Sequence, residues 1–229
     1  MKSGRFINIP VVLSGVLLVL CITITGCRGG KTEQKSAPAG EFTEADSTLL
    51  FNGKTLEGWE ITNFGPQGPV YVSGGKIILG MGDGCTGITF QKDFPEIDYE
   101  VTLEAMRVEG TDFFCGMTFP VGKDPCTLII GGWGGTVVGL SSIDGKDASE
   151  NETTRYMNFE KNRWYAIKLK VTTGLIEAWI DDEKVVDLQI TGRKLSVRPE
   201  VGLSRPFGIA SWCTAAALRN IKVHKIAGN

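Results

Sequence analysis

The stretch Ile97–Ala105, which reads IDYEVTLEA, has the clearest pattern in the chain. Every second position is apolar, and the positions between carry acids or threonine; the apolar set is Ile97, Tyr99, Val101, Leu103 and Ala105. Successive side chains of a β-strand point to opposite faces of its sheet, so this alternation predicts a strand with one buried face.

Similar strands lie on both sides of this stretch. Residues 163–172 and 175–181 alternate in the same way and are separated by Thr173-Gly174, which predicts a hairpin. Upstream, short apolar runs are separated by turn signals such as Asn52-Gly53 and Ser73-Gly74-Gly75. We also expect residues 111–121 to pair back onto residues 97–105 after Glu109-Gly110.

The pattern predicts an all-β domain over residues 45–229. No window of the chain shows a sustained helical period, and many alternating strands at this spacing are typical of an antiparallel sandwich or barrel. For this length a jelly-roll sandwich of two antiparallel sheets fits best, with one face forming a shallow groove.

Composition excludes some classes of function. The chain has 229 residues and a formal net charge of −2, with no basic stripe that could neutralise phosphates, so we expect no nucleic-acid partner. His224 is the one histidine, and alternation in IKVHK points it away from the core. Histidine-based catalytic triads and histidine-rich zinc sites are therefore disfavoured.

The N-terminus resembles an export signal. Lys2 and Arg5 precede an apolar run over residues 7–24, which leads into Thr25-Gly26-Cys27. A basic start and an apolar run are typical of a secretory signal peptide, and a cysteine after a small residue matches the bacterial lipobox. We predict a lipoprotein signal peptide at 1–26 and lipidation at Cys27. An ordinary cleaved signal and a single membrane anchor are the alternatives.

A polar tether follows the predicted lipid site. Residues 27–44 are rich in Gly, Lys, Glu, Ser and Pro and have little to bury, which predicts a flexible linker. Arg28 stands where aspartate usually marks retention in the inner membrane. We therefore expect an exported, lipid-anchored protein of the outer membrane, facing the periplasm or the cell surface, with the membrane as a partner through its acyl chains.

Four cysteines remain in the predicted domain: Cys85, Cys115, Cys126 and Cys213. Export permits disulfides, and four cysteines allow three full pairings. Cys115 and Cys126 flank a predicted turn without being direct cross-strand partners. The pairing stays open, and buried free thiols are the alternative.

Residues 126–154 carry the strongest candidate for a site. Trp133 stands among four glycines in GGWGG, and glycine lets a backbone bend and a ligand approach closely. The polar loop downstream concentrates groups that bind cations or sugar hydroxyls: Asp144, Asp147, Glu150, Asn151 and Glu152. The alternatives are a core tryptophan and a solvated charged loop.

Specific roles follow for these side chains. Glu150 and Glu152 are the predicted catalytic carboxylates, and Trp133 is a platform for a sugar ring. The remaining predicted substrate-binding residues are Asp144, Asp147, Asn151, Arg155, Arg205 and Trp212, of which Arg205 and Trp212 either line the same groove or pack. Trp59, Trp164 and Trp179 are interpreted as structural.

Several motifs, in order, resemble a known family. LFNGK at residues 50–54 is followed by Gly58-Trp59, and later come Arg163-Trp164-Tyr165, IEAWIDD at 176–182 and LRNIKV at 218–223. Together they resemble the 3-keto-disaccharide hydrolase domain family, also described as 3-keto-glucoside 1,2-lyase/hydratase, over roughly residues 48–225. The chain departs from the commoner members at residues 112–117 and 202–208, and its GGWGG stretch suggests a distinct subgroup.

The resemblance implies a concanavalin A-like jelly roll, secreted or lipid-anchored, that acts on glycosides oxidised at C3. A ketone at C3 acidifies the hydrogen on C2, so a base can remove it and the bond at C1 breaks by elimination. Addition of water then gives net hydrolysis. Such an enzyme needs a base, a proton source and a group that polarises the ketone, a task for which a divalent metal ion is one candidate cofactor.

Three hypotheses remain open from the sequence. The first is a lipid-anchored enzyme of 3-keto-glycoside breakdown, with carbohydrate as its partner. The second is a non-catalytic carbohydrate-binding domain on the same fold, and the third is a structural or adhesion lipoprotein. Fold-level analogy does not separate them.

Overall fold

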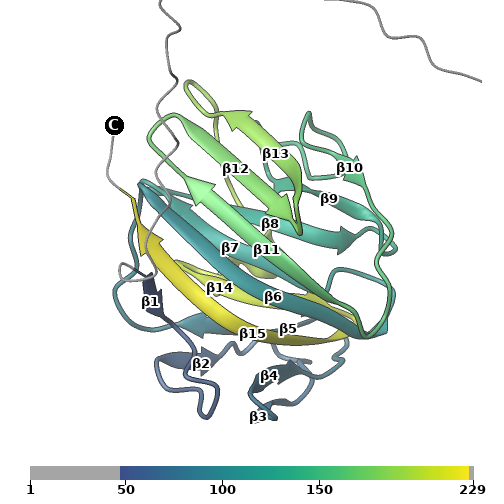
Figure 1. The fold of residues 1–229 in the computed structure, drawn as a ribbon. Helices are drawn as coiled ribbons and strands as arrows, with labels where there is room; N and C mark the ends of the chain where they lie inside the picture. The colour runs from purple at the N-terminus through teal and green to yellow at the C-terminus, as the bar shows by residue number, and fades with distance from the viewer. Residues whose placement is uncertain (1–46, 227–229) are drawn as a thin grey trace, which may run out of the picture. The chain divides into compact units, whose positions relative to one another are not determined.

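The computed structural model describes residues 47–226, which form a sandwich of two antiparallel sheets (Figure 1). The expected signal peptide, Cys27 and the whole of the expected linker lie outside the described residues. No helix within residues 47–226 has the length and apolar character that crossing a membrane requires. The predicted all-β jelly-roll class is confirmed.

One sheet has eight strands. Its order is β13 (Glu183–Gln189), β12 (Leu175–Ile180), β11 (Trp164–Val171), β6 (Tyr99–Gly110), β15 (Thr214–Lys225), β4 (Lys76–Leu79) and β3 (Val70–Ser73), with β1 (Ser47–Leu49) also pairing with β15. The predicted long strands β6, β11 and β12 lie side by side here (Figure 1).

The other sheet has seven strands. Its order is β10 (Arg155–Tyr156), β9 (Val137–Ser141), β8 (Asp124–Gly132), β7 (Cys115–Val121), β14 (Gly208–Trp212), β5 (Cys85–Phe90) and β2 (Trp59–Ile61). A short 3-10 helix, η2 (Pro199–Ser204), precedes β14.

The core lies between the sheets and follows from the alternation in each strand. Burial in β6 alternates residue by residue, with Tyr99, Val101 and Leu103 buried. The hydroxyl of Tyr99 crosses the core and donates to the backbone carbonyl of Pro120 in β7, 2.6 Å away. Burial raises the pKa of Tyr99 well above its ordinary value, so the phenol keeps the proton of this hydrogen bond.

The expected pairing of residues 111–121 with 97–105 is wrong. β6 pairs with β11 and β15, whereas β7 belongs to the other sheet and pairs with β8 and β14. The chain crosses between sheets at residues 111–114, where the backbone N–H of Asp112 donates to Thr214 Oγ1 at 3.0 Å. Strands that are neighbours in sequence usually pair, which is the reason for expecting a hairpin here. Instead, the hydrogen bond between Asp112 and Thr214, which are 102 residues apart in sequence, holds the segment where the chain crosses to the other sheet.

Other local expectations are confirmed. β3 and β4 form a hairpin through Gly74 and Gly75, whose φ angles of +57° and +76° suit a two-residue turn. β11 and β12 pair across Thr173-Gly174. His224 is half-buried and lies opposite Glu100 in β6.

The four cysteines are free thiols. Cys85, Cys115 and Cys126 are buried, and burial raises the pKa of each thiol to about 12. Cys115 faces Ile130 and Cys126 faces Phe119 across the β7–β8 ladder, so they are not direct partners. The structure corresponds to the alternative of free thiols.

Candidate functional site

A pocket of about 220 Å³ opens on the outer face of the seven-stranded sheet. Strands β8, β9 and β14 supply its floor, which consists of Thr127, Ile129, Ser141 and Trp212. The alternation in β8 explains this arrangement. Leu128 and Ile130 point into the core, so Thr127 and Ile129 must point outward into the pocket.

The GGWGG segment forms one wall. It spans the end of β8 and the turn that leads to β9. Trp133 lies in this turn, is 40% exposed and lines the pocket. Gly131, Gly134 and Gly135 all have φ between +77° and +111°, a region that favours glycine. The glycines therefore bend the hairpin so that the indole stands at the rim.

A second wall comes from the crossing segment between the sheets. Asp112 and Phe113 line the pocket there. The carboxylate of Asp112 accepts the N–H of Phe113 at 2.7 Å through Oδ1 and the N–H of Gly134 at 3.3 Å through Oδ2. This side chain therefore ties the crossing segment to the tryptophan hairpin.

A third wall carries the arginine of the pocket. Arg198 donates to Glu200 through Nε at 3.3 Å and Nη2 at 2.8 Å, and Nη1 donates to Asp147 Oδ2. Its guanidinium carbon is 5.9 Å from the Trp133 ring centroid. The hydrogen bond from Arg198 lowers the pKa of Glu200, and the hydrogen bond to Glu200 chiefly raises the pKa of Arg198. Both groups are charged at neutral pH.

Asp147 continues this network below the pocket floor. Its Oδ1 accepts the hydroxyls of Ser142 at 2.8 Å and Ser141 at 3.2 Å. Ser141 is buried and lines the pocket, so its hydroxyl proton is directed to Asp147 and its lone pairs remain for a ligand. Of the acids predicted in the loop, Asp147 is the one that reaches this site.

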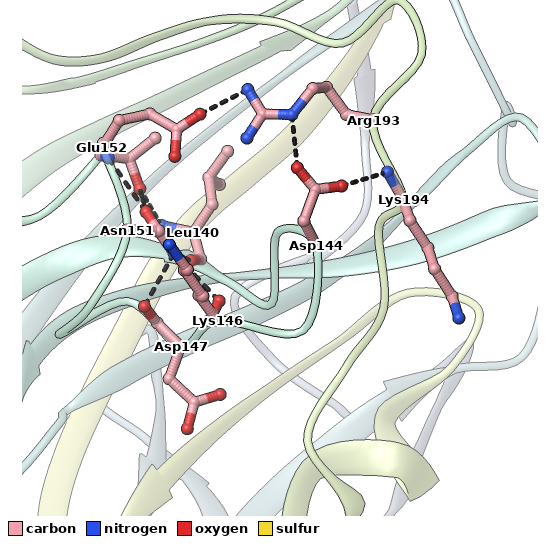
Figure 2. Close-up of polar contacts among 9 residues, drawn as sticks. Leu140, Asp144, Lys146, Asp147, Asn151, Glu152, Arg193 and Lys194 are labelled. Carbon is pink, nitrogen blue, oxygen red and sulfur yellow. Dashed lines mark hydrogen bonds and ion pairs between the residues drawn. The ribbon is translucent and has the colours of Figure 1, made fainter.

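Two other predicted acids converge elsewhere. Figure 2 shows Asp144 and Glu152 on the two sides of Arg193. Asp144 accepts the backbone N–H of Lys194 at 2.8 Å, which is the main cause of its lowered pKa, and Arg193 Nε at 2.7 Å. The hydrogen bond from Arg193 lowers the pKa of Glu152. Neither carboxylate lines the pocket.

Asn151 organises the loop. Its buried amide donates to the carbonyls of Leu140, Lys146 and Asp147 at 2.7 to 3.1 Å (Figure 2). Its Oδ1 accepts the N–H and the hydroxyl of Thr153. These bonds hold the loop closed around the amide.

The remaining predicted residues lie apart from one another. Glu150 and Arg155 are exposed, and Arg155 donates to the carbonyl of Thr154 at 3.1 Å. Arg205 lines a different, open depression together with Leu203 and Pro206. Of the predicted binding residues, Trp133 and Trp212 therefore line the pocket. Asp147 contributes through its hydrogen bond with Arg198, which also lines the pocket.

Comparison with known proteins identifies the family of the chain. A sequence profile of the 3-keto-alpha-glucoside-1,2-lyase-like domain matches residues 46–224. The chain belongs to this family. The resemblance found in the LFNGK and later motifs is confirmed. No curated protein matches the chain in sequence.

Several solved structures share the fold of this family member. A protein of Parabacteroides distasonis described as a glycosyl hydrolase has 17% identity and a TM-score of 0.54, over 82% of this chain and 99% of its own. The family 66 carbohydrate-binding module of Bacillus subtilis has 15% identity and a TM-score of 0.53, over 78% and 100%. The Bacillus licheniformis β-glucanase has 9% identity and a TM-score of 0.53, over 81% and 100%. Family and fold together support a carbohydrate-active role.

Sequence reasoning missed much of the pocket of this 3-keto-glucoside lyase-like domain. Asp112 was noted only as part of a departure from the commoner family pattern, and Arg198 and Glu200 lie in a segment without strand alternation. The sequence signal that could have pointed to this wall is Arg198-Pro199-Glu200, in which two opposite charges flank a proline. Among residues 47–226 no group of three His, Cys, Asp or Glu side chains is placed to hold a metal ion.

Proposed function

We propose that this protein cleaves 3-keto-glycosides by elimination across C1 and C2, in the pocket formed by Trp133, Trp212, Asp112 and Arg198. The observation that supports this most is the combination of two tryptophans, an arginine and a backbone-anchored carboxylate in one pocket of a domain of this family. Sugar rings present apolar faces that pack on indoles, so the tryptophans suit a glycoside.

Arg198 is the proposed electrophile. A guanidinium carries five N–H donors, and the contacts to Glu200 and Asp147 use three of them. The remaining donors can bind the C3 oxygen as negative charge develops on it. Because Glu200 and Asp147 hold the guanidinium in place, little reorganisation accompanies the reaction.

Asp112 is the proposed base. Its carboxylate is held by two backbone N–H groups and forms none of the ion pairs described above. It takes the proton from C2, the resulting enolate expels the oxygen at C1, and the proton returns to that leaving oxygen through Asp112 or water. Addition of water to the unsaturated product then completes a net hydrolysis.

The test uses a 3-keto-glucoside with a chromogenic aglycone. Asp112→Asn and Arg198→Lys are each expected to lower kcat by at least about 100-fold, since general bases and oxyanion donors contribute on that order. Glu150→Gln and Glu152→Gln are the matched variants, because these residues remain the alternative catalytic pair. Activity lost in the second set and kept in the first would move the reaction to the loop around Arg193.

A carbohydrate-binding domain without turnover is the second candidate. Two of the carboxylates at the pocket, Asp147 and Glu200, are already paired with Arg198, which suits a binding site with fixed charges. Calorimetry with the same glycoside and its C3-hydroxyl parent decides between the two. Binding of both sugars without release of the aglycone would favour the binding domain.

We also propose that the chain is exported and anchored by acyl chains on Cys27, with the outer membrane as its destination. The lipobox-like end of the apolar run supports this. In cells fed a radiolabelled fatty acid, the wild-type chain should carry label and fractionate with membranes. Label that persists in Cys27→Ser would contradict the assignment.

A further inference from the structure

Arg107 occupies a position where the sequence pattern calls for an apolar residue. Alternation in β6 points Tyr99, Val101, Leu103 and Ala105 inward, and the same period brings Arg107 inward as well. The residue is 5% exposed, and its guanidinium carbon lies 5.1 Å from the Phe114 ring centroid and 5.8 Å from that of Phe159. A buried guanidinium is costly unless it is well bonded, so its partners are informative.

Those partners are backbone carbonyls from separate segments. Nη2 donates to Asp112 at 3.1 Å, Gly131 at 3.2 Å and Gly135 at 3.0 Å, and Nη1 reaches Phe159 at 3.4 Å. Asp112 belongs to the crossing wall of the pocket, and Gly131 and Gly135 flank Trp133 in the tryptophan hairpin. One buried side chain thus binds both of these walls from behind.

The glycines of the hairpin fit this guanidinium closely. A Cβ on Gly131 would lie 2.4 Å from Arg107 Nη2, and one on Gly135 would lie 3.4 Å from Nη1. Gly134 has nothing within 4 Å of such an atom, although its φ of +84° is close to the +77° of Gly131. The first glycine of GGWGG therefore makes room for Arg107 and for the Phe114 ring, whose nearest atoms would lie 3.2 Å from such a Cβ. At Gly134 an added Cβ would meet no neighbour, and alanine there keeps the N–H that donates to Asp112.

We propose that Arg107 is the positioning residue of the pocket: it fixes the separation between Asp112 and Trp133, and thereby the placing of the sugar over the reacting groups. The activity consequence rests on the proposed function, whereas the effect on Trp133 does not. If Arg107 only stabilised the fold, substitutions that disturb it would leave the position of Trp133 unchanged in every variant that still folds.

Two alanine substitutions separate the contact from backbone strain. Gly131→Ala and Gly134→Ala impose similar strain at positive φ, but only the first crowds Arg107 and the Phe114 ring beside it. Arg107→Lys removes the guanidinium contacts without adding an atom next to Phe114, so it isolates the role of Arg107. In the full chain, acrylamide quenching of Trp133 is measured as the difference between each variant and the same variant with Trp133→Phe. We expect the quenching constant of Trp133 to change at least about twofold in Gly131→Ala and by less in Gly134→Ala.

Kinetics on the 3-keto-glucoside provide the second readout. Misplaced groups cost up to about 100-fold in rate, so Gly131→Ala should lose at least about tenfold in kcat/KM relative to Gly134→Ala. Arg107→Lys keeps the charge but lacks the planar fork, so it should resemble Gly131→Ala. If neither the wild type nor any variant cleaves the sugar, the proposed function fails, and quenching alone decides the role of Arg107.

Equal quenching and equal kinetics in Gly131→Ala and Gly134→Ala would overturn the proposal. An unfolded Gly131→Ala chain would leave the decision to Arg107→Lys, where unchanged quenching of Trp133 would also overturn it. If neither variant folds, Arg107 serves the fold as a whole, and the positioning role is wrong.

Discussion

At the scale of single residues, two arginines act on the pocket in different ways. Arg198 faces it and is held by carboxylates, so its charge is balanced and its remaining N–H groups are directed. Arg107 lies behind it and binds carbonyls, so it constrains the backbone. Burial lowers the pKa of Arg107, and the nearby Asp112 carboxylate opposes that effect.

Trp133 offers the simplest test at this scale. Its ring stands at the rim, and packing of a sugar on an aromatic face contributes about 1 kcal/mol. Trp133→Ala should therefore weaken glycoside binding about fivefold in calorimetry. The matched control is Trp179→Ala on the other sheet, where the ring packs against Lys168 at 4.2 Å. Equal loss in both variants would indicate a general effect on the fold.

At the scale of elements, β6 and β15 form the centre of the eight-stranded sheet. Their ladder contains register shifts between Ala215 and Ala216 and between Arg219 and Lys222. Next to the second irregularity, Arg219 lies opposite Glu104 and donates to both of its carboxylate oxygens, at 2.9 and 3.0 Å. The guanidinium carbon of Arg219 also lies 4.1 Å from the Trp164 ring centroid. The bidentate Arg219–Glu104 ion pair thus links β15 to β6 next to the point where their register shifts.

This pair predicts a pH dependence of stability. The hydrogen bond from Arg219 lowers the pKa of Glu104 below its ordinary value. A carboxylate with a lowered folded pKa stabilises the fold fully above its unfolded pKa and loses that contribution as pH falls through the folded value. Glu104→Gln should therefore cost up to about 1 kcal/mol in the free energy of unfolding near neutral pH, and progressively less below about pH 4.5.

Urea denaturation of both chains at pH 7, 5 and 3 measures this difference. The control is Glu57→Gln, whose carboxylate is exposed beside Lys92 with a 3.5 Å separation. That substitution should change the free energy of unfolding by less than about 0.5 kcal/mol at each pH. A Glu104→Gln penalty that grows as pH falls would refute the sign given above.

At the scale of the whole domain, one hydrophobic cluster includes side chains from both sheets. Leu128 of β8 and Leu169 of β11 belong to it, and both are fully buried. The Tyr99–Pro120 hydrogen bond also joins the sheets. Because neither sheet can cover its inner face alone, we expect residues 47–226 to unfold as one cooperative unit.

Leu128→Ala tests this cooperativity. Loss of a fully buried leucine should cost about 2–5 kcal/mol in the free energy of unfolding. Trp59 lies in the seven-stranded sheet and Trp164 in the eight-stranded sheet. Two variants, each with only one of these tryptophans retained, therefore give a separate fluorescence probe for each sheet. Both transitions should shift together, although the substitution lies in only one sheet. Separate midpoints would indicate two folding units.

The candidate site was predictable only in part. Trp133 and Trp212 have chemistry that stands out in the sequence, and both reach the pocket. Closeness in sequence to Trp133 favours Glu150 and Glu152 as catalytic residues, but a loop held by Asn151 directs Glu152 to Arg193 instead. Asp112 and Arg198 come from segments 86 residues apart and meet only when the sheet is assembled.

Alternation by itself determined the strands, the class of fold and the inward face of β6, because side-chain direction in a strand depends on local geometry. Family motifs identified the domain for a similar reason, since they are contiguous in the chain. The turn predicted between Cys115 and Cys126 already indicated that β7 pairs with β8. Only the tertiary structure decided that β7 lies beside β14 and not beside β6, that the acids of the loop separate, and that Arg107 binds two walls of one pocket. Those outcomes depend on contacts between residues far apart in sequence, which no local period specifies.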